Sequence, residues 1–251
     1  MNPYLKNLQR IEFIVTHACT GRCKHCSEAD SLRQQHHPIN AERAAEAVKS
    51  ICAHYRITSV MTFGGEPLLC PEAVCRIHAA ARDCGVAKRQ LITNGFFSRD
   101  PDHIRSVAHD LVFSGVNDIL LSVDAFHQET IPLQQVYDFA AALKAENAAL
   151  RLQPAWIVGP EGDNPYDRRT AELLACFHDL DIAVGEGNIV FPAGNALKYL
   201  AEYFDPENLP VNPYEEDPHN LSSVSILPNG ELLTGNIYHS DAPQILQQYR
   251  P

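Results

Sequence analysis

The chain is poor in positive charge and has no long apolar run. Its 251 residues include 20 Lys and Arg against 31 Asp and Glu, which gives a formal net charge of −11. An anionic surface repels a nucleic-acid backbone or an anionic membrane, so we expect neither as a partner. No apolar run approaches the roughly 20 residues that cross a bilayer, and residues 1–6 lack the features of a secretory signal. These absences predict a cytoplasmic protein.

Three of the eight cysteines lie close together. Cys19, Cys23 and Cys26 form the pattern C-x3-C-x2-C just after the apolar residues 11–15. In a chain without an export signal, such a triad indicates metal chemistry in a reducing compartment rather than disulfides. A four-iron cluster takes four cysteines, so three with no obvious fourth predict an iron–sulfur cluster with one open iron. The alternative is a zinc site with a fourth ligand from a nearby histidine: His17, His25, His36 or His37.

A second motif favours iron–sulfur over zinc. Gly64, Gly65, Glu66 and Pro67 follow a strand-like stretch, residues 59–63. The glycines let the backbone approach a ligand closely, with carbonyl groups exposed and a carboxylate beside them, and such an edge suits an ammonium group. A tight turn is the alternative interpretation of these four residues alone.

The two motifs together resemble those of the radical S-adenosylmethionine (SAM) superfamily. Its signature is this cysteine spacing near the N-terminus, and the amino and carboxylate groups of SAM chelate the open iron. The resemblance implies that Cys19, Cys23 and Cys26 hold one [4Fe-4S] cluster and that residues 64–67 receive the amino group of SAM. His25 is placed beside the cofactor, at the position where the family usually has an aromatic or planar side chain. The resemblance covers about residues 10–200.

Strand and helix patterns alternate along the chain, which indicates an α/β fold built from parallel units. We expect strands over residues 12–16, 59–63, 89–93, 118–124, 151–158 and 187–191. We expect helices over residues 40–48, 71–84, 133–147 and 171–179, with a loop over residues 159–168. The resemblance implies a partial (β/α)6 TIM-like barrel over residues 1–200 and a C-terminal extension over residues 201–251.

Parallel β/α folds place their chemistry at the carboxyl ends of the strands, where the motifs fall. The resemblance implies that Thr93 and Asn94 close around SAM from the third strand. It also implies that Ser122 and Asp124, from the fourth strand, contact the ribose or carboxylate of SAM. For Asn94 with Gly95, a simple turn is the alternative.

Other residues near these strand ends are candidates for the site. His127 directly follows the fourth strand and is placed to orient substrate or carry a proton, with a structural histidine as the alternative. Cys70 lies just past Pro67, and some family members use a thiol as hydrogen donor to a substrate radical; packing as a small hydrophobe is the alternative. Of Gln153 and Trp156, whichever faces inward lines the site, and core packing is favoured for Trp156.

The C-terminal part resembles that of peptide-modifying family members. Residues 192–196 resemble the Pro-x-Gly-Arg-Ala turn with which those proteins leave the barrel, although Asn195 replaces the arginine. Residues 225–237 resemble the hairpin of the SPASM or twitch region, with a two-residue turn at Asn229 and Gly230. No cysteine follows Cys176, so a second cluster is not expected. We expect a degenerate hairpin that caps the open barrel.

The resemblance implies reductive cleavage of SAM to methionine and a 5′-deoxyadenosyl radical, which abstracts hydrogen from a substrate. It also implies a one-electron donor such as a flavodoxin or ferredoxin. The turn and hairpin favour a peptide or protein substrate, whereas the short chain without an obvious peptide-recognition domain favours a small molecule. Outside the enzymes, the alternative is a zinc-stabilised or catalytically silent iron–sulfur protein.

Overall fold

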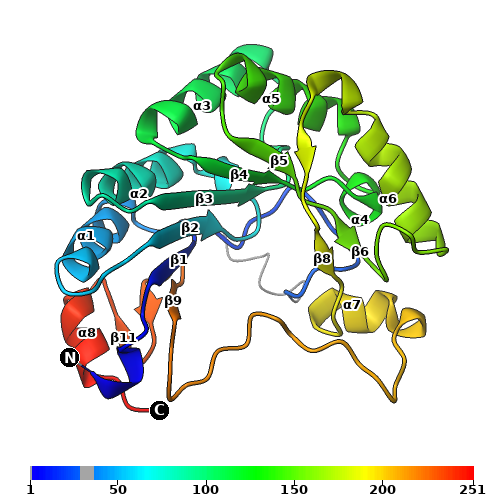
Figure 1. Ribbon diagram of the computed structural model, residues 1–251. Coiled ribbons are helices and arrows are strands. Elements are labelled where there is room, and N and C mark those ends of the chain that lie inside the picture. The colour runs from blue at the N-terminus through cyan, green and yellow to red at the C-terminus, as the bar shows by residue number, and fades with distance from the viewer. Residues whose placement is uncertain (1, 29–36) are drawn as a thin grey trace.

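A curved sheet with helices along its convex side organises the chain (Figure 1). The computed structural model describes residues 2–28 and 37–251. His36, one of the histidines considered for a zinc site, lies outside the described residues.

Within the described residues, nine strands form the main sheet in the order β11-β10-β9-β1-β2-β3-β4-β5-β7, and β6 pairs with β8. The strands are β1 (Arg10–Ile14), β2 (Ser59–Phe63), β3 (Lys88–Thr93), β4 (Asp118–Leu121), β5 (Leu150–Leu152), β6 (Ala155–Trp156), β7 (Ala183–Val184), β8 (Asn188–Ile189), β9 (Ser223–Ile226), β10 (Glu231–Leu232) and β11 (Gly235–Asn236). The helices are α1 (Ala41–Cys52), α2 (Pro71–Asp83), α3 (Pro101–Ser114), α4 (Ala125–Gln128), α5 (Leu133–Ala145), α6 (Pro165–Ala175), α7 (Gly194–Tyr199) and α8 (Ala242–Gln248). Neighbouring strands from β9 to β7 are parallel, whereas β10 is antiparallel to both β9 and β11.

The alternation of strands and helices confirms the expected α/β fold, but the last two expected strands differ from the prediction. The fifth is divided into β5 and β6 at Pro154, which has no backbone N–H to donate to a neighbouring strand. The sixth, expected over residues 187–191, is reduced to β8, and β7, which was not predicted, precedes it on the other side of Gly187, whose φ is +81°.

Helices α3, α4, α7 and α8 were not predicted, and α6 begins earlier than expected. The ends of α3 nevertheless carry clear signals. The Asp100 side chain accepts a hydrogen bond from the N–H of Asp102, and Gly115 ends the helix with a φ of +96°. Helix α6 begins within the expected loop 159–168, because the Asn164 side chain caps it by accepting from the N–H of Asp167 at 3.0 Å.

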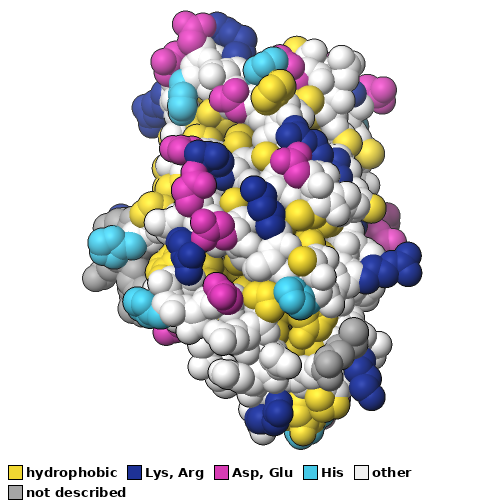
Figure 2. All heavy atoms as spheres, turned by 90° about the vertical axis from the view of Figure 1, so that its left-hand side faces the viewer, with side chains coloured by type: hydrophobic (Ala, Val, Ile, Leu, Met, Phe, Trp, Pro, Cys, Tyr) yellow, Lys and Arg dark blue, Asp and Glu magenta, His cyan; other side chains and the backbone are white. Residues whose placement is uncertain are grey.

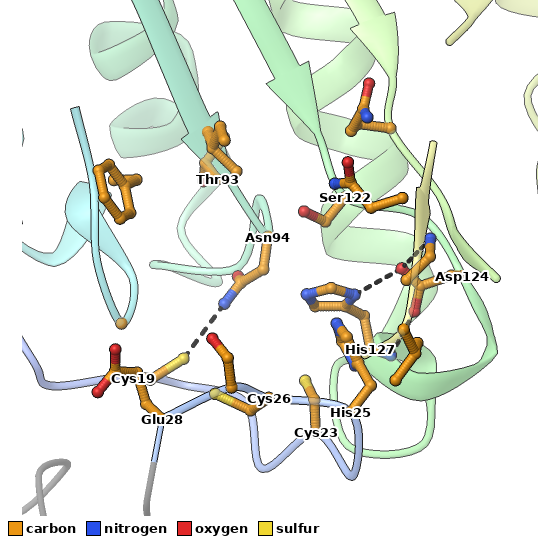
Figure 3. A pocket seen from close by; sticks show the side chains of 18 of the residues that line it. Cys19, Cys23, His25, Cys26, Glu28, Thr93, Asn94, Ser122, Asp124 and His127 are labelled. Carbon is orange, nitrogen blue, oxygen red and sulfur yellow. Dashed lines mark hydrogen bonds and ion pairs between the residues drawn. The ribbon is translucent and has the colours of Figure 1, made fainter. Parts of the chain in front are cut away.

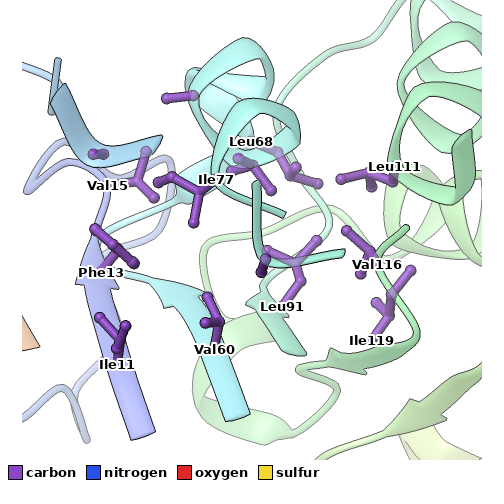
Figure 4. Packing of buried hydrophobic residues seen from close by; sticks show 14 of the residues in the cluster. Ile11, Phe13, Val15, Val60, Leu68, Ile77, Leu91, Leu111, Val116 and Ile119 are labelled. Atoms are coloured by element: carbon purple, nitrogen blue, oxygen red, sulfur yellow. The ribbon is translucent and has the colours of Figure 1, made fainter. Parts of the chain in front are cut away.

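The hydrophobic core lies between the sheet and its outer helices (Figure 4). Ile11 and Phe13 of β1 are fully buried and belong to the same hydrophobic cluster as Ile77 of α2 (Figure 4). Arg10 and Glu12, which alternate with these residues along β1, are partly exposed and belong to the concave side. Alternation along the strands therefore gives an apolar outer face and a more polar interior.

The outermost layer is solvated and of mixed charge. Figure 2 shows basic and acidic side chains interspersed over the face that includes α1 and α2. Arg43 pairs with Glu46 at 2.7 Å, and Arg76 of α2 pairs with Glu42 of α1 at 2.5 Å. Across residues 2–28 and 37–251, none of the helices has the length and apolar character needed to traverse a bilayer.

The C-terminal hairpin extends the main sheet at β1. Strand β9 pairs in parallel with β1, with Ile226 opposite Phe13. The turn contains three residues, 228–230, because the N–H of Leu227 donates to the carbonyl of Glu231 at 3.0 Å. The predicted two-residue turn was therefore one residue too short. Instead of capping the barrel opening, the hairpin lies at its β1 side (Figure 1), while a division into domains at residue 200 stays a prediction.

One buried titratable residue of the core gives a testable pH dependence. His78 of α2 is fully buried and its Nε2 lies 2.9 Å from Thr62 Oγ1; burial, aided by the charge of Arg89, lowers its pKa to about 3. In the unfolded chain His78 is protonated below about pH 6.5, whereas in the folded protein its ring stays neutral down to about pH 3. The neutral ring therefore contributes to stability fully above pH 6.5, and this contribution is lost as the pH falls towards 3. We expect urea titrations to show a loss of about 2 kcal/mol between pH 7.5 and 5 that is absent from His78→Gln. Equal losses in both proteins would contradict the assignment.

Candidate active site

A cavity of about 270 Å³ lies at the carboxyl ends of the parallel strands. Figure 3 shows side chains from the loops after β1, β3 and β4 directed towards it. Most residues expected at the site line it: Cys19, Cys23, His25, Cys26, Gly64, Gly65, Thr93, Asn94, Ser122, Asp124 and His127. The topology thus brings together motifs that are more than 100 positions apart in the chain.

The cysteine loop, residues 17–28, presents its three thiols along one side of the cavity (Figure 3). Two N–H groups point to the sulfur of Cys19: the backbone of Gly21 donates at 3.4 Å and the side-chain amide of Asn94 at 3.7 Å. Donors of this kind stabilise a thiolate and tune the sulfur ligands of iron clusters. The loop is therefore chemically suited to hold a thiolate-bound metal.

The segment after β2 is joined closely to the cysteine loop. The N–H of Gly65 donates to the carbonyl of Thr16 at 2.7 Å, and the N–H of Glu66 donates to that of Ala18 at 2.8 Å. A Cβ atom at Gly64 would lie 2.5 Å from the Thr16 oxygen, and one at Gly65 would lie 2.2 Å from the Ala18 oxygen. Only glycine permits this approach, so the pair fixes the position of the loop.

Glu66 is buried beside the cavity and does not line it. Its carboxylate accepts hydrogen bonds from Thr93 Oγ1 at 2.7 Å, from the Asn94 N–H at 2.8 Å and from the Leu68 N–H at 2.9 Å. Burial raises its pKa to about 7, against the lowering effect of these donors. Glu66 therefore positions the segment after β3, and its neighbour Pro67 is likewise buried away from the cavity lining.

The turn at the start of α7 supports the cysteine loop from the opposite side. The N–H of Asn195 donates to the carbonyl of Cys26 at 2.9 Å, and its side-chain amide donates to that of Cys23 at 3.4 Å. A Cβ at Gly194 would lie 2.3 Å from the oxygen of Ser27. Asn195, which replaces the arginine of the Pro-x-Gly-Arg-Ala pattern, therefore holds the backbone of the cysteine loop.

The fully buried Asp124 and the partly buried His127 form a pair after β4. The Asp124 carboxylate accepts from the His127 N–H at 2.9 Å and from the Ala155 N–H at 3.1 Å, and it lies 2.8 Å from His127 Nδ1. Burial alone would raise the pKa of Asp124, but the His127 contacts hold it below its usual value. Asp124 therefore caps the short helix α4 and orients the His127 ring.

Comparison with known proteins identifies the family. The model of the radical SAM superfamily matches residues 13–174, more than half of the chain. The chain belongs to the radical SAM superfamily. It is also 25% identical over 132 residues to GTP 3′,8-cyclase from Desulforamulus reducens (strain ATCC BAA-1160 / DSM 100696 / MI-1), a match that covers 52% of this chain and 38% of the cyclase.

Solved structures share the fold of this radical SAM chain. Native anSMEcpe with bound AdoMet matches with a TM-score of 0.62 at 14% identity, covering 96% of this chain and 80% of that one. BtrN in complex with AdoMet and 2-DOIA matches with a TM-score of 0.54 at 16% identity, covering 95% and 81%. These likenesses support the expected partial TIM-like barrel.

Membership of this superfamily implies a [4Fe-4S] cluster, SAM and an electron donor. The residues of the cavity fit such a group, because three thiols converge on it and hydrogen-bond donors reach the sulfur of Cys19. The zinc alternative also has a geometric basis, because ligand atoms of Cys23, His25 and His127 lie within 4.8 Å of one another. The family match favours the iron–sulfur interpretation.

The remaining candidates occupy different surroundings. His25 packs between Phe126 and His127, with ring centroids 4.9 and 4.8 Å away, so it lines the cavity as a planar side chain. Cys70 lies at the start of α2 outside the cavity lining, and burial raises the pKa of its thiol. Gln153 faces the cavity and Trp156 is buried, as the favoured interpretation of β5 and β6 had it.

Several cavity residues were not predicted from the sequence. Four of them belong to β8 or directly follow it, and the sequence analysis named none of them as site residues: Asn188, Ile189, Val190 and Phe191. Tyr214 reaches the cavity from the connector between α7 and β9, residues 205–220, and its hydroxyl donates to Asn188 Oδ1 at 2.9 Å. The position of these four residues in the expected strand 187–191 was a usable signal, whereas nothing in the sequence around Tyr214 points to this contact.

Proposed function

We propose that this enzyme uses Cys19, Cys23 and Cys26 to hold one [4Fe-4S] cluster that cleaves SAM reductively. The observation that carries the proposal is the convergence of these three thiols with Gly64 and Gly65 on one cavity. When bound, cluster and SAM supply one-electron cleavage to methionine and a 5′-deoxyadenosyl radical, which abstracts hydrogen from the substrate. The electron donor belongs to the flavodoxin or ferredoxin class.

The chain's own residues would hold SAM at the other walls of the cavity. Within the described residues, no donor bonds the carbonyl oxygens of Gly64 and Gly65, so they are open to an ammonium group. Asn94 and Ser122 line the cavity with polar side chains suited to ribose and carboxylate groups. Glu66 and Asp124 act indirectly, because their carboxylates are occupied by Thr93 and His127 respectively.

His127 is the best-placed catalytic candidate for handling a proton. Its ring lines the cavity while Asp124 fixes the tautomer and orientation through Nδ1, which leaves Nε2 for substrate. Cys70 would have to reach the cavity to donate hydrogen, and the structure places it outside the lining. We therefore base the proposal on His127 and assign Cys70 no step.

For the substrate we favour a peptide or protein. The Pro-x-Gly-x-Ala turn and the hairpin support this class, and the cavity opens beside the exposed strand β8. A small-molecule substrate is the alternative, favoured by the 25% identity to a cyclase named for GTP over 132 residues.

Anaerobic reconstitution with iron and sulfide tests the proposal. We expect the reduced protein to convert SAM to 5′-deoxyadenosine, and the variant with Cys19, Cys23 and Cys26 changed to Ala to fall to background because it lacks cluster ligands. Cys176→Ala, which removes an exposed thiol elsewhere, is the matched control and should retain iron and activity. Bound zinc in place of iron, or iron without SAM cleavage beside an active control enzyme, would refute the mechanism.

A further inference from the structure

The edge of the sheet next to the cavity has unpaired backbone groups. Strand β7 ends the order of the main sheet and β8 ends the two-stranded sheet, so within the described residues neither has an outer neighbour. All four of their residues are exposed, Val184 to 49% and Ile189 to 42%. Each of these edge strands is only two residues long, but their outward backbone groups have no strand partner within the described residues.

The hydrogen bonds to the inner neighbours show which groups face outward. The N–H of Asn188 donates to the carbonyl of Pro154, just before β6, at 2.9 Å, and the N–H of Val190 donates to that of Trp156 in β6 at 2.8 Å. Because alternate residues of a strand point their polar groups to opposite sides, the N–H and C=O of Ile189 face the open edge. The N–H of Gly185 donates inward to the carbonyl of Leu152 in the same way. The backbone N–H and C=O of Val184 therefore also face the open edge.

The same edge leads into the reaction cavity and runs beside an acidic segment. Ile189, Val190 and Phe191 line the cavity, and Tyr214 contacts Asn188 from the connector, residues 205–220. Figure 1 shows this connector crossing the open side of the barrel below β8. The connector contains five carboxylates and no Lys or Arg: Asp205, Glu207, Glu215, Glu216 and Asp217.

We propose that β7 and β8 bind an extended, basic peptide segment of the substrate by adding it as a further strand. Strand addition supplies partners for the outward N–H and C=O groups. The connector carboxylates other than Glu216, which already accepts hydrogen bonds from Ser222 and Ser223, favour Lys and Arg in the peptide. A small molecule is too short to form hydrogen bonds with backbone N–H and C=O groups that are spread along two strands. The inference rests on the proposed function, since it names the substrate class of the same cavity. Binding at this edge would guide one end of the peptide into the cavity.

A displayed library of random peptides of about 12 residues, selected on the reconstituted protein, tests this inference. We expect enriched peptides to be rich in Lys and Arg and to slow amide hydrogen exchange at Val184 and Ile189. Ile189→Pro removes the outward donor while sparing the bonds to β6, and it should weaken binding about tenfold. Ile189→Lys keeps the backbone and should also weaken it by charge repulsion, whereas Val158→Lys, at an exposed apolar site off the edge, is the matched control.

Peptides that bind all three variants equally, or that are acidic, or no enrichment at all, would overturn the inference. A wild-type dimer that Ile189→Pro dissociates would show that a second copy occupies the edge, and would overturn it as well. The proposed function fails separately, because it depends on 5′-deoxyadenosine formation and not on peptide binding. Active SAM cleavage without peptide binding would thus reject the edge site alone.

Discussion

Gly65→Ala should reduce SAM cleavage by about a hundredfold, because a small displacement of a reacting group has effects of that size. The added Cβ would lie 2.2 Å from the oxygen of Ala18 and 2.6 Å from that of His17, and both are backbone atoms that cannot rotate away. Either the Gly65–Thr16 hydrogen bond of 2.7 Å breaks or the cysteine loop moves. Both outcomes displace Cys19 relative to the end of β2.

Gly85→Ala is the control for the Gly65 variant. Gly85 has a φ of +74°, so alanine is strained there, but no atom lies within 4 Å of its added Cβ. We expect this variant to lose about 1 kcal/mol of stability and to keep its iron and its rate of SAM cleavage. Iron content, the thermal midpoint and 5′-deoxyadenosine formation should be measured together. A Gly65→Ala protein with unchanged iron and activity would show that the contact between the two loops is dispensable.

The sequence predicts the parts of the site that are local motifs. The cysteine triad and the Gly-Gly-Glu-Pro segment each lie within a few residues, and their positions after β1 and β2 follow from the order of elements. The direction of the Glu66 side chain is not local. It is decided by Thr93 and Asn94, which the register of β2 and β3 brings beside it. A carboxylate expected to face a ligand therefore faces the next strand.

Other differences arise where an element is too short or too remote to be seen in the sequence. Helix α4 has four residues, less than a full repeat of hydrophobic periodicity, so the role of Asp124 as its N-cap was not foreseen. Tyr214 meets Asn188 only because the connector crosses the open side of the barrel. Helix α3, by contrast, was predictable from its buried residues Ile104, Val107, Ala108 and Leu111, which recur at helical spacing.

Asp124→Ala should destabilise the protein by about 3 kcal/mol, because it leaves the buried partners of a fully buried carboxylate without an acceptor. Those partners are the N–H groups of His127 and Ala155 and the ring of His127. Denaturant unfolding of the reconstituted protein measures the effect. His127→Gln is the comparison, since it preserves the helix cap and removes only the ring.

Two further variants, Asp124→Asn and Ser122→Ala, separate positioning from contact with SAM. If Asp124 acts through His127, Asp124→Asn should lower the rate of product formation and leave the KM for SAM within about threefold of wild type. Ser122→Ala should instead raise that KM, because the Ser122 side chain lines the cavity and its backbone N–H, bound to the Thr93 carbonyl at 2.9 Å, is unaffected. A large rise in the KM for SAM in Asp124→Asn, with the fold intact, would restore Asp124 as a direct SAM ligand. Loss of stability with unchanged kinetics in both Asp124 variants would reduce the pair to a structural cap on α4.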